Sequence, residues 1–134
     1  MAGAPPFDYE SLRRNYRMKL KNPKEKGARL ERKVAARIRQ IGLDPDAQRM
    51  PRSGAFPHLK GDIYTNLPIH AECKWHEKIR LWEWWDETQS RSTLNKTPVL
   101  FITSNNRPIM AIVNYEYLLN LMLIEKQYLE DKCG

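Results

Sequence analysis

Apolar and polar residues alternate most clearly in the middle of the chain. Residues 62–65 and 69–75 have the β-branched and aromatic character of strands, and residues 66–68, which include a proline, are typical of a turn. We therefore predict a hairpin-like pair of strands. Because successive side chains of a strand point to opposite faces, Glu72 and Lys74 share one face and the apolar residues of the second strand share the other.

Helical periodicity appears on both sides of this hairpin, and Gly42 is suited to end the second helix. The expected elements in chain order are a helix at 8–20 capped by Asp8, a helix at 26–41, a short strand near 48–52, the hairpin, a helix at 78–92, strands at 98–103 and 109–113, and a helix from an Asn114 cap to about 130. The expected apolar helix stripes are Leu12, Tyr16 and Leu20; Leu30, Val34, Ile38 and Ile41; and Leu118, Leu121, Met122 and Tyr128. This order predicts one α/β (α+β) domain, with a central mixed sheet flanked by helices.

Two carboxylates converge at the predicted hairpin. Asp62 begins the first strand, and an antiparallel return brings it near Glu72, with Lys74 on the same face. Neighbouring carboxylates raise the pKa of at least one of the two unless a cation lies between them. Mg²⁺ is usually held by one or two carboxylates together with substrate phosphate. The pattern predicts a Mg²⁺ site, in which Mn²⁺ can substitute, and a lysine that orients the attacking water.

Glu31 borders the apolar stripe of the helix at 26–41, where an unpaired carboxylate is costly. We consider two interpretations. In the first, Glu31 forms an ion pair with a neighbouring arginine. In the second, Glu31 is a third carboxylate of the metal site, bound directly or through water.

The pattern of Asp62 followed by Glu72-Cys73-Lys74 resembles the D…ExK core of the PD-(D/E)xK nuclease superfamily, with Gly61 where proline is usual. This resemblance implies a restriction-endonuclease-like core and metal-dependent hydrolysis of DNA phosphodiesters. A Zn²⁺ site is disfavoured, because residues of the H-x-x-C-x-x-H spacing that ends at His76 alternate between strand faces.

Residues 26–43 are similar to the first helix of archaeal-type and phage Holliday junction resolvases, in which a glutamate and an arginine follow a Lys-Gly start. Residues 48–54 resemble the arginine-to-Ser-Gly loop of the same family. The matches in family order are Gly27, Glu31, Ser53, Asp62, Glu72 and Lys74. The resemblance implies that Ser53 contacts phosphate or a metal-bound water.

The chain has 23 Lys and Arg against 16 Asp and Glu, and most of the excess lies in the first third. A basic region of this kind favours a polyanionic partner, most often nucleic acid, although a solubilising surface has the same composition. The side chains expected to hold DNA phosphates are Lys26, Arg29, Arg32, Arg49 and Arg52.

The predicted helix at 78–92 is rich in tryptophan. Trp82 and Trp85, one turn apart, are expected to pack on the sheet or on a partner subunit, although tryptophans can also stack on unpaired bases. Relatives of the resembled family place a glutamine on this helix near the active site, which makes Gln89 a candidate.

Together these patterns favour a Mg²⁺-dependent Holliday junction resolvase acting as a homodimer. The alternatives are a nicking or restriction-type endonuclease of the same superfamily, and a non-catalytic DNA-binding protein. We expect a basic helical extension at 1–24 and the nuclease domain at 25–134. The sequence shows no membrane span or signal-peptide core, so we expect a cytoplasmic protein with reduced Cys73 and Cys133.

Overall fold

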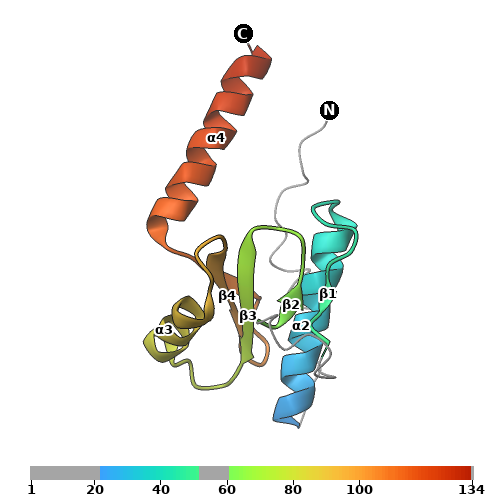
Figure 1. Cartoon of the computed structure of the whole chain (residues 1–134). Helices are drawn as coiled ribbons and strands as arrows, with labels where there is room; N and C mark the ends of the chain where they lie inside the picture. Colours follow the sequence, from blue (N-terminus) through green and yellow to red (C-terminus); the bar gives the residue numbers. More distant parts are fainter. Residues whose placement is uncertain (1–21, 52–60, 134) are drawn as a thin grey trace.

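The computed structural model describes residues 22–51 and 61–133 (Figure 1). The elements in chain order are α2 (Pro23–Gln40), β1 (Gln48–Arg49), β2 (Ile63–Tyr64), β3 (Ile69–Trp75), α3 (Leu81–Arg91), β4 (Thr97–Thr103), β5 (Met110–Ile112) and α4 (Tyr115–Cys133). This order is the predicted one from the second helix onward. The helix expected at 8–20 lies outside the described residues, as do Arg52 and Ser53.

Helix α2 begins earlier than predicted, because Asn22 caps it. The Asn22 side chain accepts a hydrogen bond of 3.0 Å from the Lys24 amide, and Pro23 takes the first helical position, where its missing N–H costs nothing. Gly42 is the residue that follows the C-cap of this helix, as expected, and has a φ of +82°. The amides of Leu43 and Gly42 donate to the carbonyls of Ile38 and Arg39 in a Schellman pattern. Ile41 is 53% exposed, so its predicted burial is wrong: the chain leaves the helix there.

The hydrophobic core lies between α2 and β3. Leu30, Val34, Ala35 and Ile38 form the buried stripe of α2, as the periodicity predicted for three of them. From β3, the alternating residues Ala71, Cys73 and Trp75 complete this core. The predicted apolar face of β3 is therefore confirmed, and its opposite face is left for charged side chains.

The main sheet is mixed, as predicted. Strand β4 lies between β3 and β5, parallel to β3 and antiparallel to β5. The hairpin prediction needs correction, because β2 forms its ladder with β1 and not with β3. One backbone bond still joins the two predicted partners: the Asp62 amide donates to the Ala71 carbonyl at 2.8 Å.

Helix α3 packs against β3 and β4, and its buried tryptophan is Trp84, whereas the pair expected to pack was Trp82 and Trp85, of which Trp85 is half-buried. Trp84 and Thr88 are buried, while Trp82 is 74% exposed. The helix begins at Leu81, later than predicted.

Helix α4 extends away from the rest of the domain (Figure 1). Asn114 caps it, as predicted, by accepting a bond of 2.9 Å from the Glu116 amide. None of its residues is buried, so the predicted burial of Leu118, Leu121, Met122 and Tyr128 is wrong. No helix in the described part of the chain has the length and apolar character that crossing a membrane requires.

Candidate active site

Asp62 is fixed against β3 at both its backbone and its side chain. Its amide donates to the Ala71 carbonyl, and its Oδ2 accepts a bond of 2.8 Å from the Cys73 amide. Gly61 makes this approach possible. It has a φ of +98°, and a Cβ there would lie 3.1 Å from the Ala71 carbonyl oxygen. Glycine at this position is thus required by the local geometry.

Glu72 lies on the buried, polar face of β3 and is 4% exposed. Its Oε1 lies 2.9 Å from His70 Nε2 and 3.6 Å from Arg91 Nη1. The Asp62 and Glu72 carboxyl groups lie close enough together for each to shift the pKa of the other. The sequence prediction that these two carboxyls lie close together is therefore confirmed.

The environment separates the pKa values of the two carboxyls. Burial raises the pKa of Asp62 to about 7, against the Cys73 amide bond, and the charges of Glu72 and Glu31 add to the rise. Burial also disfavours charge on Glu72, but its bonds with His70 and Asp62 and the nearby Arg91 hold its pKa below the usual range. Of the two carboxyls, Asp62 is therefore the weaker acid and Glu72 the stronger one.

Lys74 shares the face of Glu72 and is partly exposed, with its Nζ 3.8 Å from Glu87 Oε2. Glu87 also pairs with Arg91 Nη2 at 2.7 Å, one helical turn along α3. Arg91 also reaches Glu72, so a chain of alternating charges runs from Lys74 through Glu87 and Arg91 to Glu72. Lys74 is consequently positioned beside the carboxylates by a helix as well as by its own strand.

Glu31 lies on α2 and is 3% exposed. Its Oε2 accepts a bond of 2.6 Å from Arg49 Nε, so the ion pair with a neighbouring arginine is present. The charge of Glu31 also acts on the site that contains Asp62, as the metal-site interpretation requires, since it raises the pKa of both Asp62 and Cys73. A shallow hollow lined by the first two turns of α2 and by Arg49 opens onto Glu31.

The donor chemistry fits a hard divalent cation. Asp62 and Glu72 present adjacent carboxyls in a partly buried place where burial raises the pKa of Asp62 to about 7, and a cation would favour the charged form of both. Within residues 22–51 and 61–133, no three His, Cys, Asp or Glu side chains are grouped closely enough to enclose a metal ion by themselves. Mg²⁺ is commonly bound by one or two carboxylates, with water and phosphate oxygens completing its coordination.

The other candidate residues are more scattered. Gln89 is exposed, and it leaves α3 about 200° around the helix from Glu87 and from Arg91, so the structure does not bring it to the carboxylates. On α2, Arg32 is exposed, and Lys26 and Arg29 are half-buried. Arg29, Arg32 and Lys33 line a second hollow, where burial and the charge of Arg29 lower the pKa of Lys33.

Sequence reasoning missed three residues of this site: His70, Glu87 and Arg91. His70 precedes Glu72 by two positions and therefore had to share its strand face, which was a usable signal. Glu87 and Arg91 are spaced i, i+4 on the helix that follows the strand, but that spacing alone is also typical of a surface ion pair.

The family of this chain is established by comparison with known proteins. Residues 22–132 match the family described as "Phage putative PDDEXK endonuclease". No curated protein and no solved structure matches the chain. The match covers the elements that carry Glu31, Asp62, Glu72 and Lys74, and it agrees with the juxtaposition of the two carboxylates. The chain thus belongs to the phage PD-(D/E)xK endonuclease family, whose members are nucleases acting on DNA.

Proposed function

We propose that this protein is a Mg²⁺-dependent endonuclease that cuts four-way DNA junctions. The observation that carries the proposal is the close approach of Asp62, held by the Cys73 amide, to Glu72, which shares one face of β3 with Lys74. This is a site for hydrolysing a phosphodiester and not merely for binding one, because a DNA-binding surface alone gains nothing from buried acidic groups.

Asp62 and Glu72 would hold the cation, with Glu31 contributing through water, because the three carboxyls are not grouped closely enough to bind it together. When bound, the cation supplies positive charge against the phosphodiester and its leaving oxygen. The Lys74 ammonium orients the attacking water and stabilises charge that develops on the phosphate. His70 and Arg91 hold the Glu72 carboxylate in place, and the Asp62 carboxylate is held by the Cys73 amide.

The basic residues of α2 provide the surface for the DNA backbone. Arg32 is exposed, and the hollow that it shares with Arg29 and Lys33 is positively charged. The preference for junctions is supported by the sequence similarity to resolvases, centred on Glu31 and Arg32. A two-fold homodimer follows from the chemistry, since resolving a junction requires symmetric cuts in two strands.

The test is cleavage of labelled four-way junction, flap and linear duplex, with and without Mg²⁺. We expect Mg²⁺-dependent cuts that favour the junction, and loss of cleavage with retained binding in Asp62→Asn, Glu72→Gln and Lys74→Ala. Asp131→Asn, an exposed carboxylate in the last turn of α4, is the matched control. Equal cutting of linear duplex would replace the junction proposal by a plain nicking nuclease. A wild-type rate in Lys74→Ala would refute the role of that lysine.

A further inference from the structure

Arg91 brings a positive charge from α3 to the carboxylates at β3. Its Nη1 lies 3.6 Å from Glu72 Oε1, and its Nη2 lies 2.7 Å from Glu87 Oε1. Helix α3 packs on β3 and β4, and its buried side chains are Trp84 and Thr88. Arg91 therefore reaches Glu72 from a helix whose position on the sheet is fixed by packing.

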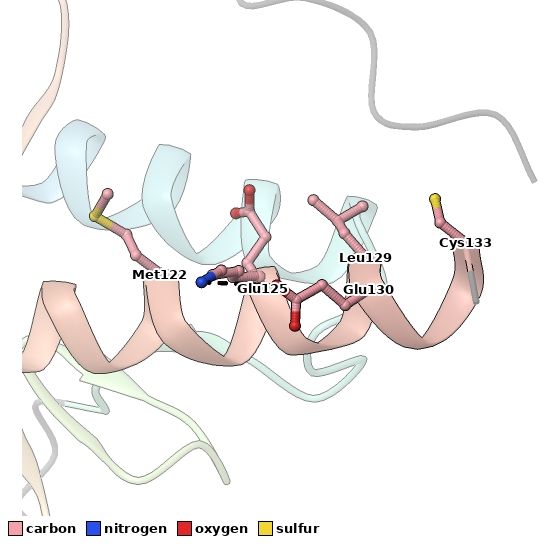
Figure 2. Close-up of a pocket in the computed structure, with 6 residues that line it drawn as sticks. Met122, Glu125, Leu129, Glu130 and Cys133 are labelled. Atoms are coloured by element: carbon pink, nitrogen blue, oxygen red, sulfur yellow. Dashed lines mark ion pairs between the residues drawn. The ribbon is translucent and has the colours of Figure 1, made fainter.

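An acid–base pair on α4 shows what the same i, i+4 spacing gives on a plain surface. Lys126 Nζ lies 3.6 Å from Glu130 Oε1, and both side chains are largely exposed (Figure 2). No ion pair joins either side chain to another element of the described chain. Arg91 differs, because it also meets a buried carboxylate on a strand. Helical spacing explains its pair with Glu87 and does not explain its contact with Glu72.

The contact between Arg91 and Glu72 leaves hydrogen-bond donors unused. At 3.6 Å it is an ion pair, and it is too long for a hydrogen bond. The closer neighbour of Glu72 Oε1 is His70 Nε2, at 2.9 Å. Because the Arg91 side chain is half exposed, its Nη1 can donate to an acceptor that arrives from solvent.

An incoming phosphate is the acceptor that the charges favour. This inference rests on the proposed function, in which Asp62 and Glu72 hold a cation. With a cation at Glu72, the Arg91 guanidinium would face a like charge unless an anion lay between them. The phosphodiester brings that anion to the same place, because substrate phosphate completes the coordination of Mg²⁺. A guanidinium also has the planar, forked set of donors that matches two phosphate oxygens.

We propose that Arg91 is a further catalytic residue, which binds the scissile phosphate, and that Glu87 is its positioning residue. Arg91 donates to the non-bridging oxygens and stabilises the negative charge that grows on them as water attacks. It transfers no proton, because a guanidinium stays charged. Glu87 holds Arg91 through Oε1, and its Oε2 lies 3.8 Å from Lys74 Nζ. One carboxylate thus keeps both cationic side chains beside the site.

Cleavage at saturating DNA and Mg²⁺ is the first test. Arg91→Ala should lower kcat by about 10²–10³-fold, and Arg91→Lys should recover part of the loss, because it restores the charge without the fork. Excess Mg²⁺ should not restore the rate of Arg91→Ala, since the lost contact is with phosphate. Arg80→Ala, at an exposed arginine that precedes α3, is the matched control and should cut like the wild type. Full recovery of Arg91→Ala in excess Mg²⁺ would overturn the proposal.

Binding to DNA that carries one neutral methylphosphonate at the scissile position tests the contact without cleavage. The Lys74→Ala protein serves as the host, because it is expected to bind DNA with Mg²⁺ and not to cut it. The neutral phosphate should cost this protein about tenfold more affinity than it costs the double variant Lys74→Ala with Arg91→Ala. Equal costs, measured by fluorescence anisotropy, would show that Arg91 does not contact that phosphate.

Glu87→Gln tests the positioning role. It should slow cleavage in the wild type and cost less in the Arg91→Ala background, because part of its effect passes through Arg91. Glu130→Gln makes the same change in the exposed pair of α4 and should have no effect. Equal losses in both backgrounds would refute the role of Glu87.

These results are distinguishable from failure of the proposed function. A wild type that cuts no DNA with Mg²⁺ would overturn both proposals. A wild type that cuts, beside an Arg91→Ala variant that cuts equally fast, would overturn the role of Arg91 alone.

Discussion

His70 Nε2 lies 2.9 Å from Glu72 Oε1, and both side chains are buried on the same face of β3. The ring of His70 also packs beneath the backbone of Gly61, because a Cβ at Gly61 would lie 3.3 Å from its Cε1 atom. His70 therefore touches both the carboxylate of Glu72 and the residue that precedes Asp62. It contacts Glu72 directly and lies near Asp62 only through the neighbouring Gly61.

Removing this contact should weaken metal use more than it weakens the fold. We expect His70→Leu to raise the Mg²⁺ concentration for half-maximal cleavage by about 10–100-fold, the range typical of residues that orient a metal ligand. His70→Gln keeps an N–H donor and should recover much of the loss. The measurement is a Mg²⁺ titration of cleavage beside thermal melts of both variants. If His70→Leu and His70→Gln had equal Mg²⁺ requirements and lost melting temperature in parallel, the role of His70 would be purely structural.

The raised pKa of Asp62 should make the metal-free protein less stable as pH rises. The pKa of Asp62 rises from its ordinary value of 3.8 to about 7 in the folded chain, so between these two pH values the folded state binds the proton more tightly than the unfolded state does. The free energy of unfolding therefore falls as pH rises through the window, and the penalty is complete above about pH 7.

Asp62→Asn removes the ionisable group and should remove this penalty. In the absence of divalent cations, we expect the variant to melt several degrees above the wild type at about pH 8 and close to it at about pH 4, since 1 kcal/mol corresponds to roughly 4 °C in a domain of this size. Added Mg²⁺ should narrow the gap at the higher pH. Identical melting curves for the two proteins across this pH range would contradict the assignment.

The Glu31–Arg49 pair should respond unequally to loss of its two members. Arg49→Ala removes a guanidinium from a carboxylate that is 3% exposed, whereas Glu31→Gln replaces that charge by a neutral amide. We expect Arg49→Ala to cost about 1–3 kcal/mol and Glu31→Gln to cost less. Chemical unfolding of both single variants and the double variant measures their coupling.

The same Glu31→Gln variant separates the two interpretations of Glu31. An increased Mg²⁺ requirement with a nearly unchanged melting temperature would place the carboxylate in the metal site. Unchanged metal dependence with a large loss of stability would leave it with the structural ion pair alone.

Reversal of the exposed charge at Arg32 should weaken binding to all DNA sequences alike. With phosphate contact, Arg32→Glu should also make the salt dependence of log affinity shallower by about 0.9 for the phosphate lost. Lys96→Glu, at an exposed turn before β4, is the control with the same change of charge. Fluorescence anisotropy over a range of salt concentrations measures both. If the two variants behave identically, net charge and not a local contact explains the effect.

The site could be predicted largely where the pattern is local. Alternation along residues 69–75 determines which side chains share a face. The turn before them is short, so the chain must bring Asp62 back beside the strand that carries Glu72. The ladder between β2 and β1 could not be predicted in this way, because strand pairing depends on segments far apart in the sequence. Ser53 and Arg52 lie outside the described residues, and their roles remain predictions.

The errors on α4 and α3 have different causes. An apolar stripe predicts that a helix face is covered, but not that the cover comes from the same chain, and α4 has none within the described residues. For α3, the choice among Trp82, Trp84 and Trp85 depends on how the helix is rotated on the sheet. Gln89 was a candidate from the family resemblance, and the same rotation leaves it exposed. A single sequence does not determine that rotation.

The burial of Cys73 has a practical consequence. Burial and the charges of Asp62, Glu31 and Glu72 raise the pKa of its thiol well above the usual value, so that thiol is chemically silent near neutrality. Cys133, the second of the two cysteines, is exposed at the tip of α4. The unmodified protein thus has a single reactive thiol, that of Cys133. The rate at which it reacts with a chromogenic disulfide measures how accessible the C-terminal end of α4 is in solution.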